Sequence, residues 1–210
     1  MTDFNEIKNT LVNLDEQTLI QLVNDELKKG TPAADILNNG LIAGMDIVGE
    51  KMENEDMFIP EVLMAAQAMS KGVEILKPLL GEDDSASKGS VIIGTVKGDL
   101  HDIGKNLVAM MMESAGFIVH NLGVDIAPED FVAQVKEKNA TILCLSALLT
   151  TTMPMMKQTV DAIVEGGLRD QVKIMVGGAP VTQAFADEIG ADGFAADAGS
   201  ASKLAKSLAA

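Results

Sequence analysis

The stretch VIIGTVKGDLHDIGKNLV, residues 91–108, joins an apolar run to a helical pattern through a short polar loop. The run VIIGTV (91–96) is typical of a buried strand, and the apolar spacing after residue 103 is typical of a helix. The loop between them contains His101, one of only two histidines in 210 residues. Parallel α/β folds bind ligands at the carboxyl ends of their strands, so this junction is the first candidate for a site.

The same alternation continues to the end of the chain. Further strand-like runs lie at 117–123, 141–147 and 172–178, with a weaker one at 193–197. Helical patterns lie at 103–115, 128–139, 152–166, 180–190 and 199–208. Strands that alternate with helices at this spacing indicate βαβ units. We therefore predict an α/β domain over residues 89–210, a flavodoxin-like (Rossmann-type) five-stranded parallel sheet with helices on both faces.

Residues 1–80 follow a different pattern, with apolar side chains at three- and four-residue steps. Asp15 is placed to cap a second helix, Thr31-Pro32 to cap and begin a third, and Ile59-Pro60 to begin a fourth. Amphipathic helices joined by short loops predict a four-helix bundle, which we assign to an N-terminal domain over residues 1–85. The small, polar stretch at 81–90 is interpreted as the linker.

Composition excludes several classes of protein. The net charge of −15 argues against a nucleic-acid partner, which requires a basic face. The acidic N-terminal half is either a solvated helical surface or a docking face for a basic partner. No run of about eighteen apolar residues predicts a transmembrane helix, and the polar amino terminus is unlike a signal peptide. Cys144, the only cysteine, lies in an apolar run, so we expect a buried thiol and a cytoplasmic protein.

The residues around His101 suit a metal ligand. Asp99 lies two residues before it and Gly104 three after it, so the carboxylate can hold one ring nitrogen while the other binds a metal. The alternative is that His101 caps the helix, with Asp99 and Asp102 as ordinary acids near its positive end. The second histidine, His120, has no adjacent acid and is interpreted as an ordinary strand residue. Nucleotide-binding glycine loops and the G-x-S-x-G hydrolase motif are absent from the sequence.

The spacing D-x-H-x-x-G, with the domain order around it, resembles small corrinoid methyl-carrier proteins and the cobalamin-binding module of cobalamin-dependent methionine synthase. The resemblance covers essentially the whole chain. It implies that cobalamin binds with its dimethylbenzimidazole withdrawn from cobalt and inserted into the α/β core, and that His101 is the axial cobalt ligand. Asp99 would then accept the other ring N–H, and Gly104 would leave room beside the inserted tail.

Two further motifs follow the resemblance. S-x-L-x-T is present as Ser146, Leu148 and Thr150, with another hydroxyl at Thr152, and it implies hydrogen bonds to the tail and to the histidine–aspartate pair. Alternatively, these residues only cap the next helix. The paired glycine after the fourth strand would let a nucleotide loop approach the backbone. The remaining residues assigned to the cofactor are Gly98, Asp102, Ile103, Gly177, Gly178 and Ala179.

The helical half also matches the family, because an apolar residue precedes the proline that begins its fourth helix. The resemblance implies that Met52 and Ile59 cover the upper cobalt face. Methionine synthases have an aromatic residue at the position of Met52. The alternative is that these residues, with Met64 and Met69, form bundle core.

The resemblance implies a methyl-group carrier rather than a complete enzyme. Its expected partners are a substrate-specific corrinoid methyltransferase, a second methyltransferase that uses coenzyme M or tetrahydrofolate as acceptor, and a reductive activase, with no nucleic acid and no membrane. Two other readings use cobalamin: a light or ligand sensor, which usually carries a DNA-binding domain, and a mutase subunit, which lacks the helical bundle. A response-regulator domain would need an aspartate where the third strand ends in Ser146-Ala147.

Overall fold

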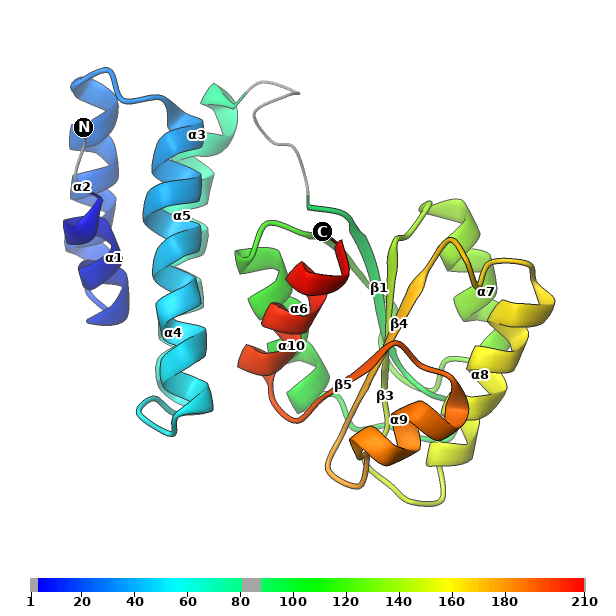
Figure 1. Cartoon of the computed structure of the whole chain (residues 1–210). Helices are drawn as coiled ribbons and strands as arrows, with labels where there is room; N and C mark the ends of the chain where they lie inside the picture. The colour runs from blue at the N-terminus through cyan, green and yellow to red at the C-terminus, as the bar shows by residue number, and fades with distance from the viewer. Residues whose placement is uncertain (1–3, 81–87, 210) are drawn as a thin grey trace. The chain divides into compact units, whose positions relative to one another are not determined.

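The computed structural model describes residues 4–80 and 88–209, which divide into two compact units, one helical and one α/β (Figure 1). Most of the predicted linker lies outside the described residues, so the domain limits at 85 and 89 stay predictions. None of the described helices is long and apolar enough to cross a membrane.

The helical unit contains the four expected helices. The first two, α1 (Asn5–Val12) and α2 (Glu16–Lys28), form a hairpin. The third runs without a break through α3, a π-helical segment η1 and α4, and the fourth, α5, ends in a short 3₁₀ turn η2. The bounds of these elements are Ala33–Asp35, Ile36–Ile42, Ala43–Glu53, Ile59–Leu76 and Lys77–Leu79.

Local contacts fix where these helices begin. Asp15 caps α2 as predicted, because its carboxylate accepts a hydrogen bond from the Thr18 backbone N–H at 3.1 Å. The predicted cap at Thr31 is wrong. Its hydroxyl instead donates to the Glu26 carboxylate at 2.8 Å, and Pro32 occupies the position before the first helical residue. The helices enclose a core that includes Ile7, Leu11, Leu19, Val23, Ile36, Leu41, Val48, Val62, Met69 and Leu76.

The α/β unit is built on a five-stranded parallel sheet with the order β2-β1-β3-β4-β5. The strands are β1 (Ser90–Thr95), β2 (Ile118–Asn121), β3 (Ile142–Ser146), β4 (Lys173–Gly177) and β5 (Gly193–Ala195). The helices are α6 (Ile103–Ser114), α7 (Pro128–Glu137), α8 (Met153–Glu165), α9 (Gln183–Ile189) and α10 (Ala198–Ala209). This strand order confirms the predicted flavodoxin-like fold.

Helices cover both faces of the sheet, with α6 and α10 on one side and α7, α8 and α9 on the other (Figure 1). Successive strand residues therefore point into different layers. Ile92 and Leu143 belong to the cluster that includes residues of α7, α8 and α9, whereas Cys144 lies against Met112 of α6. Because both layers are apolar, the central strands are continuously buried, which explains their uniformly apolar sequences.

The strand order also fixes where a ligand belongs. From β1 the chain passes to the edge strand β2, whereas from β3 it proceeds to β4 and β5 in the other direction. The loops that follow β1 and β3 therefore leave toward opposite faces of the sheet. Folds of this kind bind ligands at such a switch point, at the carboxyl ends of the strands. His101 lies in the loop that follows β1, and Ser146 is the last residue of β3.

Candidate functional site

The loop after β1 turns sharply before it reaches the candidate histidine. Gly98 has a φ of +84°, a left-handed conformation that residues with a side chain rarely adopt. Directly after it, the Asp99 side chain is fully buried, whereas the His101 side chain is half exposed. The turn therefore directs the carboxylate into the protein and leaves the imidazole ring at the surface.

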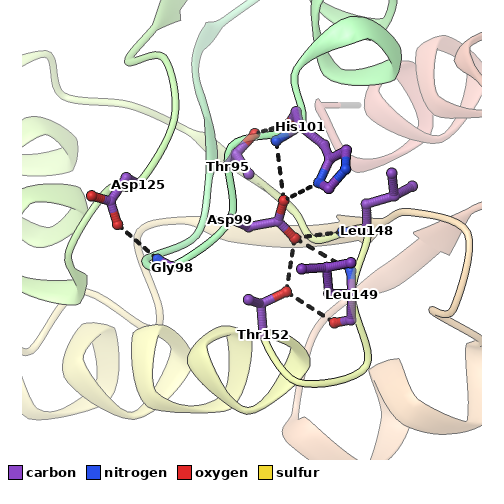
Figure 2. Close-up of polar contacts among 8 residues, drawn as sticks. All are labelled: Thr95, Gly98, Asp99, His101, Asp125, Leu148, Leu149 and Thr152. Atoms are coloured by element: carbon purple, nitrogen blue, oxygen red, sulfur yellow. Dashed lines mark hydrogen bonds and ion pairs between the residues drawn. The ribbon is translucent and has the colours of Figure 1, made fainter.

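Asp99 is the hydrogen-bonding centre of the site (Figure 2). Its Oδ1 lies 2.7 Å from Nδ1 of His101 and accepts from the His101 backbone N–H at 3.1 Å. Its Oδ2 accepts from the backbone N–H of Leu148 at 2.8 Å and from the Thr152 hydroxyl at 2.8 Å. A weaker contact from the Leu149 N–H, at 3.3 Å, completes the set. One buried carboxylate thus ties the loop after β1 to the loop after β3.

These contacts explain why Asp99 is ionised. Burial alone would raise the pKa of its carboxyl group, but the hydrogen bonds from His101, Leu148 and Thr152 outweigh burial and hold the pKa well below its ordinary value. A carboxylate can only accept hydrogen bonds, so Nδ1 of His101 must carry the hydrogen that lies between them. In the neutral ring the lone pair is then on Nε2, for which the described part of the chain provides no partner.

That donor set suits a metal that brings its own ligands. Among the described residues there is no group of three or more histidine, cysteine, aspartate or glutamate side chains placed to hold a metal ion. A bare ion in a protein usually needs three or four such ligands. One oriented imidazole with a free Nε2 fits instead a metal whose other positions are filled by a macrocycle.

Apolar side chains surround the imidazole without being packed. On either side of His101, Leu100 in the loop is 72% exposed and Ile103, the first residue of α6, is 79% exposed. Leu148 and Leu149, which donate to Asp99 through their backbone, are also large exposed hydrophobic residues. An exposed apolar rim around a polar centre is typical of a surface that a large ligand covers.

Two glycines near the site have different surroundings. A Cβ atom at Gly104 would meet nothing within 4 Å, so the first turn of α6 borders open space. A Cβ at Gly178 would lie 1.9 Å from the carbonyl oxygen of Ala147, and Gly178 has a φ of +133°. The close approach of the β3 and β4 loops therefore requires a glycine at that position.

The residues of the S-x-L-x-T motif and the hydroxyl that follows it differ in whether they contact Asp99. Thr152 is buried and bonds to Asp99, as the resemblance implied for the last hydroxyl. Leu148 contributes its backbone N–H to the same carboxylate. Thr150 is exposed and Ser146 is only partly buried, and within residues 4–80 and 88–209 no contact assigns either side chain a role. The predicted contacts of Ser146, Thr150, Gly177 and Ala179 with a cofactor stay predictions, as do those of Gly98, Asp102 and Ile103.

Thr95 is a site residue that sequence reasoning missed. It is fully buried at the end of β1, and its hydroxyl donates to the backbone carbonyl of His101 at 2.8 Å. A threonine within an apolar strand is common, so its type gave no signal. The available clue was its place, as the one hydroxyl residue at the end of the buried run that leads into the loop.

In the helical unit, the alternative of bundle core holds for only part of the methionine and isoleucine set. Met69 is buried in the core. Ile59 and Met64 are among the exposed large hydrophobic residues, and Met52 is partly buried at the end of α4. The assignment of Met52 and Ile59 to the upper cobalt face stays a prediction.

Comparison with known proteins identifies the family. Residues 89–203 match one family model described as a B12 binding domain, and residues 3–77 match a second with the same description. The chain belongs to the B12-binding corrinoid proteins. It is 50% identical over 176 residues to dimethylamine corrinoid protein 1 of Methanosarcina acetivorans, a match that covers 83% of each chain.

Two solved structures resemble the whole chain. A cobalamin-binding protein from Desulfitobacterium hafniense matches with a TM-score of 0.86 and 34% identity, over 98% of each chain. A chain of the methanol:cobalamin methyltransferase complex MtaBC from Methanosarcina barkeri matches with a TM-score of 0.83 and 29% identity, over 97% of this chain and 78% of that one. The cofactor of this corrinoid protein is therefore cobalamin or a related corrinoid, which supplies the macrocycle that the donor set requires.

Proposed function

We propose that this corrinoid protein is a methyl-group carrier in which His101 is the lower axial ligand of cobalt. The observation that carries the proposal is the pairing of His101 Nδ1 with the buried Asp99 carboxylate, which leaves Nε2 free at the surface. When the corrinoid is bound, its cobalt supplies the chemistry of methyl transfer. The protein's part is to bind the cofactor, orient the imidazole and set its basicity.

In this proposal the residues of the α/β unit have different parts in binding the cofactor. Asp99 fixes the tautomer of His101, and Thr152 with the backbone N–H of Leu148 keeps Asp99 ionised and in place. Open space beside Gly104 receives the displaced nucleotide tail of cobalamin. The apolar rim of Leu100 and Ile103 packs against the corrin ring. Each of these residues holds the cofactor, and none is placed to activate a methyl donor.

A carrier needs at least two partner enzymes. The relative from Methanosarcina acetivorans is named for dimethylamine, and the Methanosarcina barkeri structure is titled as a methyltransferase complex. Both names support a substrate-specific methyltransferase as the first partner. The dimethylamine name supports a methylamine as the donor, whereas the complex is one for methanol. The proposed second partner is a methyltransferase with coenzyme M or tetrahydrofolate as acceptor, and a reductive activase would restore oxidised cofactor.

The first test is the visible spectrum of the purified protein after incubation with hydroxocobalamin and desalting. The chain offers a matched control, because it contains only two histidines and His120 lies in strand β2. We expect stoichiometric corrinoid in the wild type and in His120→Ala, with a shifted spectrum in His101→Ala alone. Identical spectra for both variants would remove His101 from cobalt, and loss of corrinoid from the wild type would contradict the proposed function itself.

The carrier role has its own test. Loaded protein whose cobalt has been reduced to cob(I) with titanium(III) citrate should not demethylate dimethylamine alone. Addition of a dimethylamine methyltransferase from a related system should then give methylated corrinoid, which can be followed by its spectrum. Demethylation by the carrier alone would show that it is an enzyme in its own right.

A further inference from the structure

Residues 121–125, from the last residue of β2 onward, contact the segment that carries His101. Figure 2 shows one of these contacts, between Asp125 and Gly98. Oδ1 of Asp125 accepts a hydrogen bond from the backbone N–H of Gly98 at 2.7 Å. The backbone N–H of Asp125 in turn donates to the carbonyl oxygen of Asp99 at 3.1 Å. Asp125 therefore contacts the two residues that make the turn before His101, although it does not contact His101.

The same residues also contact the first turn of α6, which follows the loop. Nζ of Lys105, which is almost fully buried, donates to Oδ1 of Asn121 at 2.6 Å and to Oδ1 of Asn106 at 2.6 Å. Nδ2 of Asn121 donates to Oδ1 of Asn106 at 2.9 Å. Residues 121–125 thus contact the chain on both sides of His101, at Gly98 in the loop and at Lys105 and Asn106 in the first turn of α6.

Polar contacts, rather than the packing of large apolar side chains, hold this part of the chain in place. The two large apolar side chains on either side of His101, Leu100 and Ile103, are mostly exposed. Asp125 also adopts a left-handed φ of +57°, which costs conformational energy in a residue other than glycine. In this conformation the Asp125 carboxylate accepts the hydrogen bond from the Gly98 backbone N–H, and Gly98 itself has a φ of +84°.

We propose that Asp125 is a positioning residue for the axial histidine: by fixing the Gly98–Asp99 turn, it keeps His101 in the place from which Nε2 binds cobalt. The proposal rests on the proposed function, since it assumes that His101 is the axial ligand. Without the Gly98 bond the turn gains freedom, and more of the binding energy of His101 is spent on ordering the loop. His101 should then be easier to displace from cobalt.

The experiment measures that displacement directly. Protein labelled with 15N-histidine is loaded with cob(II)alamin, whose electron paramagnetic resonance spectrum is split by the axial nitrogen. Coordination by labelled His101 gives a doublet splitting, and displacement by unlabelled imidazole changes it to a triplet. The midpoint of an imidazole titration then reports how firmly His101 is held. The proteins compared are the wild type, Asp125→Ala, Asp125→Asn, and Asp170→Ala as a control for loss of an exposed loop carboxylate.

We expect the imidazole midpoint of Asp125→Ala to be about tenfold lower than that of the wild type, because a hydrogen bond to a charged acceptor is lost. Asp125→Asn keeps an acceptor of the same shape but without charge, so its midpoint should lie between the two, and Asp170→Ala should match the wild type. If Asp125→Ala does not fold, as judged by circular dichroism, the Asp125→Asn midpoint decides alone. Wild-type midpoints in every folded Asp125 variant would overturn the proposal. A wild-type spectrum without the labelled doublet would instead refute His101 as the ligand.

Discussion

The Thr152 hydroxyl lies 2.8 Å from Oδ2 of Asp99, and this contact crosses the point where the loops after β1 and β3 diverge. The same hydroxyl lies 2.9 Å from the carbonyl oxygen of Leu149, but its single hydrogen can serve only one acceptor fully. The carboxylate is the stronger acceptor because it is charged. Thr152 therefore belongs to the network around His101, although it lies 53 residues from Asp99 in the sequence.

Thr152→Val tests this contact, because valine has nearly the same shape and lacks the hydroxyl. Asp99 would keep its backbone donors, so we expect the free energy of unfolding of the cofactor-free protein to fall by about 1–2 kcal/mol. Thr152→Ser should recover most of the loss. The chain has no Trp or Tyr, so urea unfolding is followed by far-ultraviolet circular dichroism. Unchanged stability in Thr152→Val would mean that the bond contributes nothing net.

Asp99→Asn should change the tautomer of His101. Asn presents one acceptor oxygen where Asp presents two, and the N–H donors of Leu148 and His101 compete for it. If the oxygen faces Leu148, the amide NH₂ faces Nδ1 and requires its lone pair, which places the hydrogen on Nε2 and removes the cobalt ligand. We expect corrinoid to be retained without the axial-nitrogen splitting in the cob(II) spectrum. Asp170→Asn, which removes an exposed charge elsewhere, should keep the splitting.

Most of the fold could be predicted from the sequence because the spacing of apolar residues indicates which segments are strands and which are helices. Buried runs such as 91–96, alternating with helical patterns along the chain, are typical of βαβ units. The predicted strands lie within a few residues of the observed ones. The ends of the helices in the helical unit were harder to predict. Thr31 is chemically a good cap, but Glu26 takes its hydroxyl through a contact that no local pattern specifies.

In the site, too, local contacts could be predicted and contacts between distant segments could not. The pairing of Asp99 with His101 is local, so spacing was enough to predict it. The contacts of Asp125 and Lys105 depend on which strands are neighbours. Asp125 reaches Gly98 across 27 residues because β2 lies beside β1. Such contacts follow from strand order and register, which single-sequence patterns do not give.

Cys144 should be unreactive in the folded protein. Burial raises the pKa of its thiol to about 12, so the reactive thiolate is scarce at every pH below that value. At pH 8, Ellman's reagent should therefore label no thiol in the native protein and one thiol per chain in concentrated urea. The rate should rise with urea in parallel with the loss of the circular dichroism signal. Rapid labelling of native protein at pH 8 would show that the sheet opens readily between β3 and α6.

Gly104→Leu separates folding from cofactor binding. A Cβ at this position meets nothing within 4 Å, and leucine is a better helix former than glycine by roughly 0.5–1 kcal/mol. We therefore expect the cofactor-free variant to unfold at an equal or higher urea concentration than the wild type. If the open space receives the nucleotide tail of cobalamin, the leucine side chain occupies it and desalted protein should retain little corrinoid. Gly104→Ala, with a single added methyl group, should lie between the two. Full corrinoid retention by Gly104→Leu would place the tail elsewhere, whereas a less stable cofactor-free protein would contradict the open space itself.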